Sequence, residues 1–169
     1  MIKIIQSLKE MKDKEIIDDY AIGGATALIY YFEPIQTMDV DVFILIQSKG
    51  LLTNLNPIYE FFRERGGIVK NEYIVINNTP VQFLIPYNSL IESALENAVN
   101  VDYGDTKVKI FTLEFLMAIM VQTSRAKDKG RLEEIMRAEI TFNEKLFLSI
   151  LNEYTLEEKW IKIKSGFEI

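Results

Sequence analysis

The sequence predicts an α+β fold whose C-terminal half is helical. Two observations carry this prediction. Short runs of β-branched and aromatic residues alternate with helical patterns as far as residue 111, whereas the chain from Thr112 onward has helical spacing throughout. The sequence contains no repeat, low-complexity tract or linker-like run. We therefore interpret residues 1–169 as one domain, with an α/β core over 1–111 and a helical part over 112–169.

Three local signals define the elements of the first part. Apolar residues at helical spacing, or a capping box, predict helices over residues 2–12, 25–32, 53–65 and 89–98. Runs of β-branched and aromatic residues predict strands over 20–22, 39–46, 73–77, 81–85 and 107–111. Turn residues set the boundaries: Pro34 ends the second helix, Gly66 and Gly67 follow the third, and Asn78 to Pro80 predicts a hairpin.

Capping patterns place the later helix starts. Ser89 is followed by Glu92 in the arrangement of a capping box, and the same spacing recurs from Thr141 and from Thr155. We expect helices to begin at these residues and at Thr112. The apolar stripe of the helix after Thr112 is predicted to face the core.

Composition limits the chemistry that the chain can perform. With 49% apolar and 26% charged residues it is typical of globular proteins. It has no cysteine and no histidine, which excludes disulfides, thiol nucleophiles, Ser-His triads and zinc sites built on these residues. A metal must then be held by oxygen atoms, which favours Mg²⁺, Mn²⁺ or Ca²⁺.

Length and charge limit where the protein acts. No apolar run reaches the roughly 20 residues that span a bilayer, and the N-terminus lacks the apolar core of a secretory signal. We therefore expect a cytoplasmic protein without a membrane partner. A net charge of −6 argues against a broad basic surface for nucleic acid, although a local basic cluster remains compatible with it.

The first candidate site combines two glycines with two acids. Gly23 and Gly24 stand where a predicted strand passes into a helix, a position that suits a phosphate group because the helix N-terminus offers unpaired N–H groups. Asp39 and Asp41 are two residues apart on the next strand and therefore share one face. Two carboxylates this close favour a bound cation, such as a divalent metal that also binds phosphate.

The second candidate site is the basic segment 123–131, between two predicted helices. It contains four cations, among them Arg125 and Lys127, next to Asp128. Cations of this kind bind the phosphates of a nucleotide in phosphoryl-transfer sites. The alternative is a solvated helix start with Asp128 placed favourably near the helix N-terminus.

These two segments resemble the polymerase-β-like nucleotidyltransferase superfamily. The stretch Ala21 to Leu28, followed by Thr37-Met-Asp-Val-Asp-Val, is similar to small bacterial proteins of the abortive-infection toxin type and their relatives. The resemblance extends from Tyr20 to about Arg131. It implies a nucleotidyltransferase-type mixed sheet flanked by helices, an NTP substrate, a toxin-like role and a partner protein.

The resemblance also assigns roles to individual residues. Asp39 and Asp41 would be catalytic and would bind the metal. The nucleotide-binding residues would be Gly23, Gly24, Thr37, Arg125, Lys127, Asp128 and Arg131, the last four because the segment 123–131 resembles a segment of such proteins that contains Lys-Asp-x-x-Arg. Asp128 would orient one of the neighbouring cations.

One position departs from the family pattern. Where the family has a third carboxylate that acts as metal ligand and base, this chain has Gln82. An amide cannot accept a proton in that role. Glu72, Asp102 or Asp105 are the candidates to replace it, and the sequence selects none of them.

Three functions follow from these features. The first is a metal-dependent enzyme that moves an NMP group from an NTP to an acceptor hydroxyl on RNA, protein or a small molecule. The second is a protein of the same fold that binds NTP or a partner without catalysis, which Gln82 favours. The third is an interaction domain in which the acid pair is incidental.

Overall fold

The computed structural model describes residues 1–32, 37–46 and 54–167, which form one mixed sheet and eight helices. The strands are β1 (Asp19–Ile22), β2 (Val40–Leu45), β3 (Ile68–Lys70), β4 (Tyr73–Ile76), β5 (Thr79–Leu84), β6 (Val99–Tyr103) and β7 (Thr106–Ile110). The helices are α1 (Ile2–Asp13), α2 (Gly24–Tyr31), α3 (Asn56–Arg63), α4 (Ser89–Glu96), α5 (Leu113–Thr123), α6 (Ala126–Arg137), α7 (Glu144–Glu153) and α8 (Glu157–Lys164).

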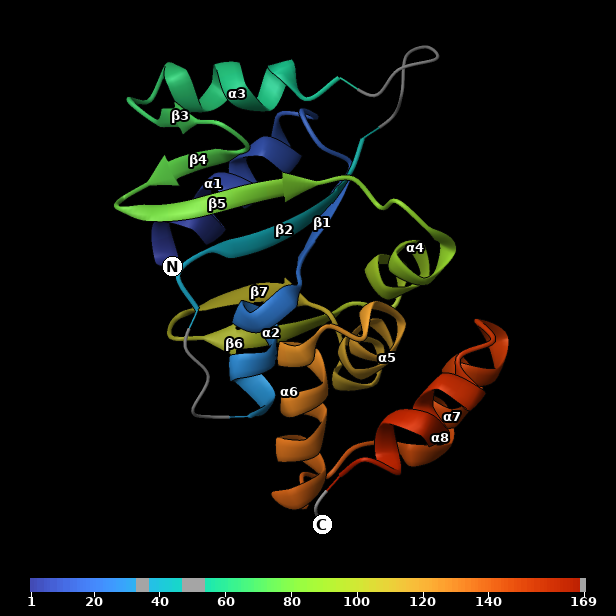
Figure 1. The fold of residues 1–169 in the computed structure, drawn as a ribbon. Helices are drawn as coiled ribbons and strands as arrows, with labels where there is room; N and C mark the ends of the chain where they lie inside the picture. The colour runs from blue at the N-terminus through green and yellow to red at the C-terminus, as the bar shows by residue number, and fades with distance from the viewer. Residues whose placement is uncertain (33–36, 47–53, 168–169) are drawn as a thin grey trace.

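The seven described strands are ordered β3-β4-β5-β2-β1-β7-β6. β2 runs parallel to β5 and β1 runs parallel to β7, whereas the other neighbours are antiparallel. Helix α1 lies behind the sheet, and α5 to α8 gather at the end of the molecule next to β7 (Figure 1). This arrangement confirms the predicted α+β class, the mixed sheet and the helical C-terminal part.

A cluster of buried apolar side chains joins the sheet to the helices. It includes Val42 and Ile44 of β2, Met117 of α5 and Phe147 of α7, none of them more than 1% exposed. Burying side chains of this size supplies most of the driving force for folding. Trp160 of α8 also lies inside this cluster.

Most predicted elements occur within one or two residues of their expected bounds, and the hairpin of β4 and β5 is confirmed. Two strands were missed, β3 and β6, which form the two edges of the sheet. The second helix ends at Tyr31, and Pro34, which was predicted to end it, lies outside the described residues.

The predicted helix caps need correction. Asn88, not Ser89, caps α4, because its side chain accepts a hydrogen bond from the Ile91 N–H. Asn143, not Thr141, caps α7 in the same way. The N-cap position of α8 is Leu156, directly after Thr155. In the described part of the chain, no helix is both long and apolar enough to cross a bilayer.

Candidate active site

The two predicted acids lie at the start of β2, in the middle of the sheet. Asp39 precedes the strand and Asp41 is its second residue, and both are half-buried. The valines on either side of Asp41 are buried in the core. The alternation expected from the sequence therefore holds, and the acids face away from the core. Asp41 is paired in register with Gln82 of the parallel strand β5.

The glycine pair holds the Asp41 side chain against the start of α2. The Gly23 N–H donates to the Asp41 carbonyl oxygen at 2.9 Å. Gly24 has φ +57°, a left-handed conformation that favours glycine, and a Cβ there would lie 2.1 Å from Asp41 Oδ2. A carboxylate oxygen therefore occupies the space that any other residue at position 24 would need.

Two threonines fix the backbone of Asp39. Thr26 Oγ1 of α2 donates to the Asp39 carbonyl oxygen at 3.0 Å. Thr37 Oγ1 lies 3.1 Å from the same oxygen and 3.1 Å from Asp39 Oδ1. Thr37 was predicted to contact nucleotide, and the structure shows it positioning an acid. Hydrogen bonds at both acids thus join the start of α2 to the start of β2.

Within the basic segment, Arg125 and Asp128 form a hydrogen-bonded ion pair at the start of α6. Arg125 Nε donates to Asp128 Oδ2 at 2.6 Å, and a second guanidinium nitrogen donates to Oδ1 at 3.1 Å. Thr123 Oγ1 also donates to Asp128 Oδ2, at 2.7 Å. Asp128 is only 1% exposed, whereas Arg125 reaches solvent. The buried carboxylate therefore fixes the direction of an accessible guanidinium group.

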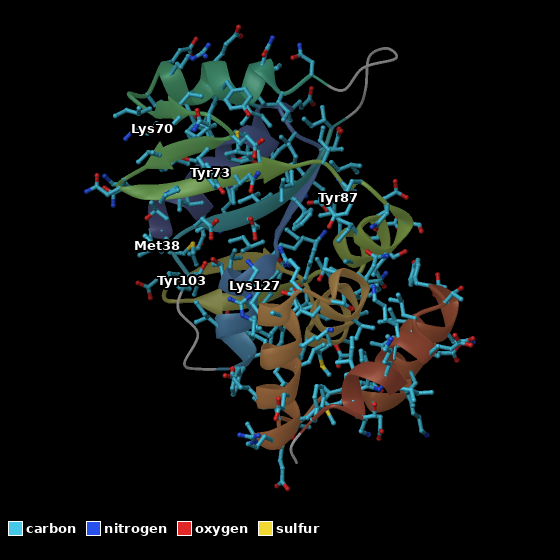
Figure 2. The ribbon with its side chains drawn as sticks, in the orientation of Figure 1. Met38, Lys70, Tyr73, Tyr87, Tyr103 and Lys127 are labelled. Carbon is cyan, nitrogen blue, oxygen red and sulfur yellow. The ribbon has the colours of Figure 1, made fainter. Side chains whose placement is uncertain are left out.

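Electrostatics shows that the two predicted sites face each other. Burial raises the pKa of Asp41, and the nearby charge of Asp39 raises it further. Lys127, Arg125 and Arg131, at the start of α6 and its N-cap, lower this pKa, so their positive charges lie on the side of the Asp41 carboxylate. Lys127 stands at the start of α6 (Figure 2).

A cavity of about 220 Å³ lies between these groups. One part of its wall is polar, with Gly24, Asp41 and Gln82 from the sheet side and Arg125, Asp128 and Arg131 from the α6 side. Another part is apolar and includes Leu28, Phe43 and Phe111. Leu116 and Met120, predicted to belong only to a core-facing stripe, are buried and line the cavity as well.

The position of the expected third carboxylate is now defined. Gln82 lines the cavity beside Asp41, and its Nε2 donates to Glu72 Oε2 at 3.2 Å. Asp102 lies on β6, the far edge of the sheet, where it is paired with Lys107. Asp105 lies in the adjoining turn between β6 and β7.

Sequence reasoning missed three residues that shape the site: Thr26, Tyr87 and Thr123. Tyr87 lines the cavity, is 63% exposed and influences the pKa of Arg125. The two threonines position Asp39 and Asp128 through hydrogen bonds. No local pattern marks a lone threonine or tyrosine for such a role; only contact across the fold reveals it.

The donor set fits a divalent metal that is shared with phosphate. Within residues 1–32, 37–46 and 54–167, no group of three or more acidic, histidine or cysteine side chains forms a metal cage. The chain offers the Asp41 carboxylate in the cavity wall, and Asp39 is near enough for its charge to act on Asp41. Mg²⁺ is commonly held by one or two carboxylates, with water and substrate phosphates as its other ligands.

Comparison with known proteins places the fold. No protein-family model and no curated protein sequence matches the chain. Among solved structures, an antigenic nucleotidyltransferase-like protein from Paracoccidioides brasiliensis aligns over 99% of this chain and 93% of its own, with a TM-score of 0.57 and 14% identity. ANT(2″)-Ia, solved in complex with adenylyl-2″-tobramycin, aligns over 97% of both chains, with a TM-score of 0.51 and 11% identity.

These similarities define the class of fold. The chain has the polymerase-β-like nucleotidyltransferase fold that its motifs implied. The alignments cover the helical part as well as the sheet, since nearly all of the chain is included. The narrower resemblance to toxins of the abortive-infection type stays a prediction.

Proposed function

We propose that this protein transfers a nucleotidyl group from an NTP to an acceptor hydroxyl, with Mg²⁺ or Mn²⁺ bound by Asp39 and Asp41. One observation carries the proposal: a half-buried carboxylate, seated against a glycine turn at a helix N-terminus, faces Arg125 and Arg131 across a cavity, and the charge of Lys127 also acts on it. This arrangement supplies negative charge for the metal ion and positive charge for the triphosphate. The fold is consistent with it, and ANT(2″)-Ia was solved with a nucleotidylated small molecule.

Each side chain has a defined task in this proposal. The backbone at Gly23 and Gly24, at the N-terminus of α2, binds the phosphates next to Asp41, whose carboxylate lies against Gly24. Arg125 and Lys127 neutralise the leaving pyrophosphate, and Asp128 keeps Arg125 aimed at the cavity. When bound, the divalent metal would withdraw charge from the phosphate oxygens.

Two further residues complete the nucleotide site. Arg131 lines the same cavity wall as Arg125 and adds positive charge opposite Asp41. Thr37 acts indirectly, because its hydroxyl group holds Asp39 in place. The acceptor is an RNA end, a protein side chain or a small molecule. A toxin-like role with a partner protein is supported by the motifs around Gly23 and Asp39.

A second candidate function rests on Gln82. With an amide in place of the third carboxylate, the protein would bind NTP or a partner protein without transferring the nucleotide. This candidate and the first share the nucleotide site and differ only in turnover.

One experiment separates these functions. The purified protein is incubated with each NTP labelled at the α-phosphate, with Mg²⁺ or Mn²⁺, and with total RNA, total protein or tobramycin as acceptor. Label transfer by the wild type that is lost in the Asp39→Asn/Asp41→Asn double variant supports the enzyme. Metal-dependent NTP binding without transfer supports the second candidate, and absence of NTP binding refutes both.

A further inference from the structure

A hydrogen bond links the family's missing carboxylate position to a carboxylate in the turn just before β4. Gln82 stands beside Asp41 in the cavity wall, and its side chain donates to Glu72 at 3.2 Å. Glu72 directly precedes β4, whose first residue, Tyr73, is paired in register with Gln82. The sheet therefore brings an acid to the position next to the one where an acid is lacking.

The chemistry of the two groups fixes their orientation. An ionised carboxylate only accepts hydrogen bonds, so the amide must present its nitrogen to Glu72 and turn its oxygen elsewhere. Gln82 therefore holds Oε2 of Glu72 in place through this hydrogen bond, which does not involve the other carboxylate oxygen, Oε1. Glu72 is exposed, so this oxygen is accessible to a molecule arriving from solvent.

The direction of attack points to the same side. In nucleotidyl transfer, the incoming hydroxyl oxygen and the leaving pyrophosphate lie roughly in line on opposite sides of the α-phosphorus. The cations that suit the pyrophosphate belong to α6 and its N-cap, on one side of Asp41. On the other side, the neighbour of Asp41 in the sheet is Gln82 of β5, and β4 lies next to β5. The hydroxyl must then approach from the side of Gln82 and Glu72.

The sheet is open on this side. Register places Gln82, Tyr73 and Lys70 in one row on neighbouring strands, continuing the row of Asp41. Lys70 and Tyr73 project from the front of the sheet, where no helix of the described chain covers β4 and β5 (Figure 2). An acceptor can therefore reach the cavity along β4 without displacing a packed element.

We propose that Glu72, positioned by Gln82, is the general base of the reaction, and that the acceptor enters over the open face of β4 and β5. The acceptor hydroxyl gives its proton to the Glu72 carboxylate, and its oxygen forms a bond to the α-phosphorus. The bond from this phosphorus to the bridging oxygen breaks, and pyrophosphate leaves with the electron pair. This inference rests on the proposed function and names the residue that the family pattern lacks.

The other two candidate acids do not meet these conditions. Asp102 belongs to β6, which β7 and β1 separate from β2. Its carboxylate is 81% exposed and faces Lys107 at 3.9 Å. Asp105 lies in the turn at the end of the same edge strand. Both are on the opposite side of Asp41 from Gln82 and Glu72.

The test compares Glu72→Gln with wild type and with Asp102→Asn as the matched control. Glu72→Gln keeps the shape of the side chain and can still pair with Gln82, so we expect the Kd for Mg²⁺·NTP to change less than twofold. With the acceptor pool that the wild type labels, kcat should fall about 100-fold or more. Asp102→Asn should retain both values.

A double variant separates a lost base from a disturbed strand. Gln82→Asp places a carboxylate beside Asp41. The kcat of Glu72→Gln/Gln82→Asp should therefore be at least tenfold higher than that of Glu72→Gln. The inference is overturned if Glu72→Gln keeps its kcat, if its nucleotide affinity falls as much as its rate, or if the double variant recovers nothing. Failure of the wild type to transfer label to any pool would instead refute the proposed function.

Discussion

Replacing Gly24 with alanine tests whether the glycine turn serves the carboxylate beside it. Gly24 has φ +57°, and the new Cβ would lie 2.1 Å from Asp41 Oδ2. Gly104, in the turn between β6 and β7, has φ +58° and nothing within 4 Å of its Cβ position. The two glycines therefore share the same backbone strain and differ in the contact with Asp41.

The expected magnitudes follow from these two terms. Alanine in a left-handed conformation costs about 1–2 kcal/mol, offset by about 0.4–1 kcal/mol from the less flexible unfolded chain. Both variants should thus lose about 1 kcal/mol of unfolding free energy. At Gly24 the carboxylate of Asp41 must also move by about 1 Å to regain ordinary contact distance. A displacement of this size in an active site costs about 100-fold in rate.

Urea unfolding, NTP binding and label transfer measure the two terms separately. We expect Gly24→Ala and Gly104→Ala to have similar stability, and only Gly24→Ala to lose metal-dependent NTP binding and turnover. Equal nucleotide binding and turnover in the two variants would show that the Asp41 side chain has room to adjust. The geometric argument for the site would then be wrong.

Two further predictions concern buried carboxylates. Burial and the charge of Asp39 raise the pKa of Asp41 above its ordinary value of 3.8, so the folded protein binds this proton more tightly than the unfolded chain does. The stability of the protein therefore falls as pH rises from 3.8 through the raised pKa. Asp41→Asn in EDTA should therefore be more stable than wild type at pH 7, with a gap that closes below pH 3.8. Burial acts to raise the pKa of Asp128 as well, but its hydrogen bonds, chiefly from Arg125, outweigh burial and lower it below 3.8. The ionised Asp128 carboxylate therefore stabilises the fold above pH 3.8, and this stabilisation is lost as pH falls through the lowered pKa. Asp128→Asn should lower the free energy of unfolding by about 1–3 kcal/mol at pH 7.

Thermal and urea unfolding across pH check both predictions. Asp102→Asn, an exposed carboxylate in a weak surface pair, is the control and should change stability by less than about 0.5 kcal/mol. A destabilised Asp41→Asn variant at pH 7 would contradict the first prediction. An Asp128→Asn variant as stable as the Asp102→Asn control would contradict the second.

Sequence patterns captured the parts of the fold that local chemistry determines. The turn between β4 and β5 was recognisable from Asn78 to Pro80, and the exposed and buried alternation around Asp41 followed from strand geometry. The family resemblance implied that Asp128 orients one of the neighbouring cations, and the structure pairs it with Arg125.

The edge strands and the caps escaped prediction for physical reasons. β6 alternates Val99, Val101 and Tyr103 with Asn100 and Asp102, which are depleted in strands, so it contains no continuous run of β-branched and aromatic residues. β3 is only three residues long. At α4, both Asn88 and Ser89 are good capping residues, and only the backbone geometry of the entering chain selects Asn88.

The meeting of the two halves of the site was beyond any local pattern. Asp41 and Lys127 lie in separate parts of the chain, and packing of the helical part against the sheet brings their charges together. Sequence similarity to a family supplied that connection in advance, but it gave no partner for Gln82. The contact with Glu72 depends on strand register, which is a property of the whole sheet.

Strand β5 carries the core and the site on alternate residues. Val81 and Phe83 are buried on one side, while Gln82 between them faces Asp41. A deletion of one residue in the turn before β5 would therefore turn a large apolar side chain toward the cavity and force an amide into the interior. Changes in the length of this hairpin should be far less tolerated than substitutions in it, since each change in length would disrupt the proposed site and the core together.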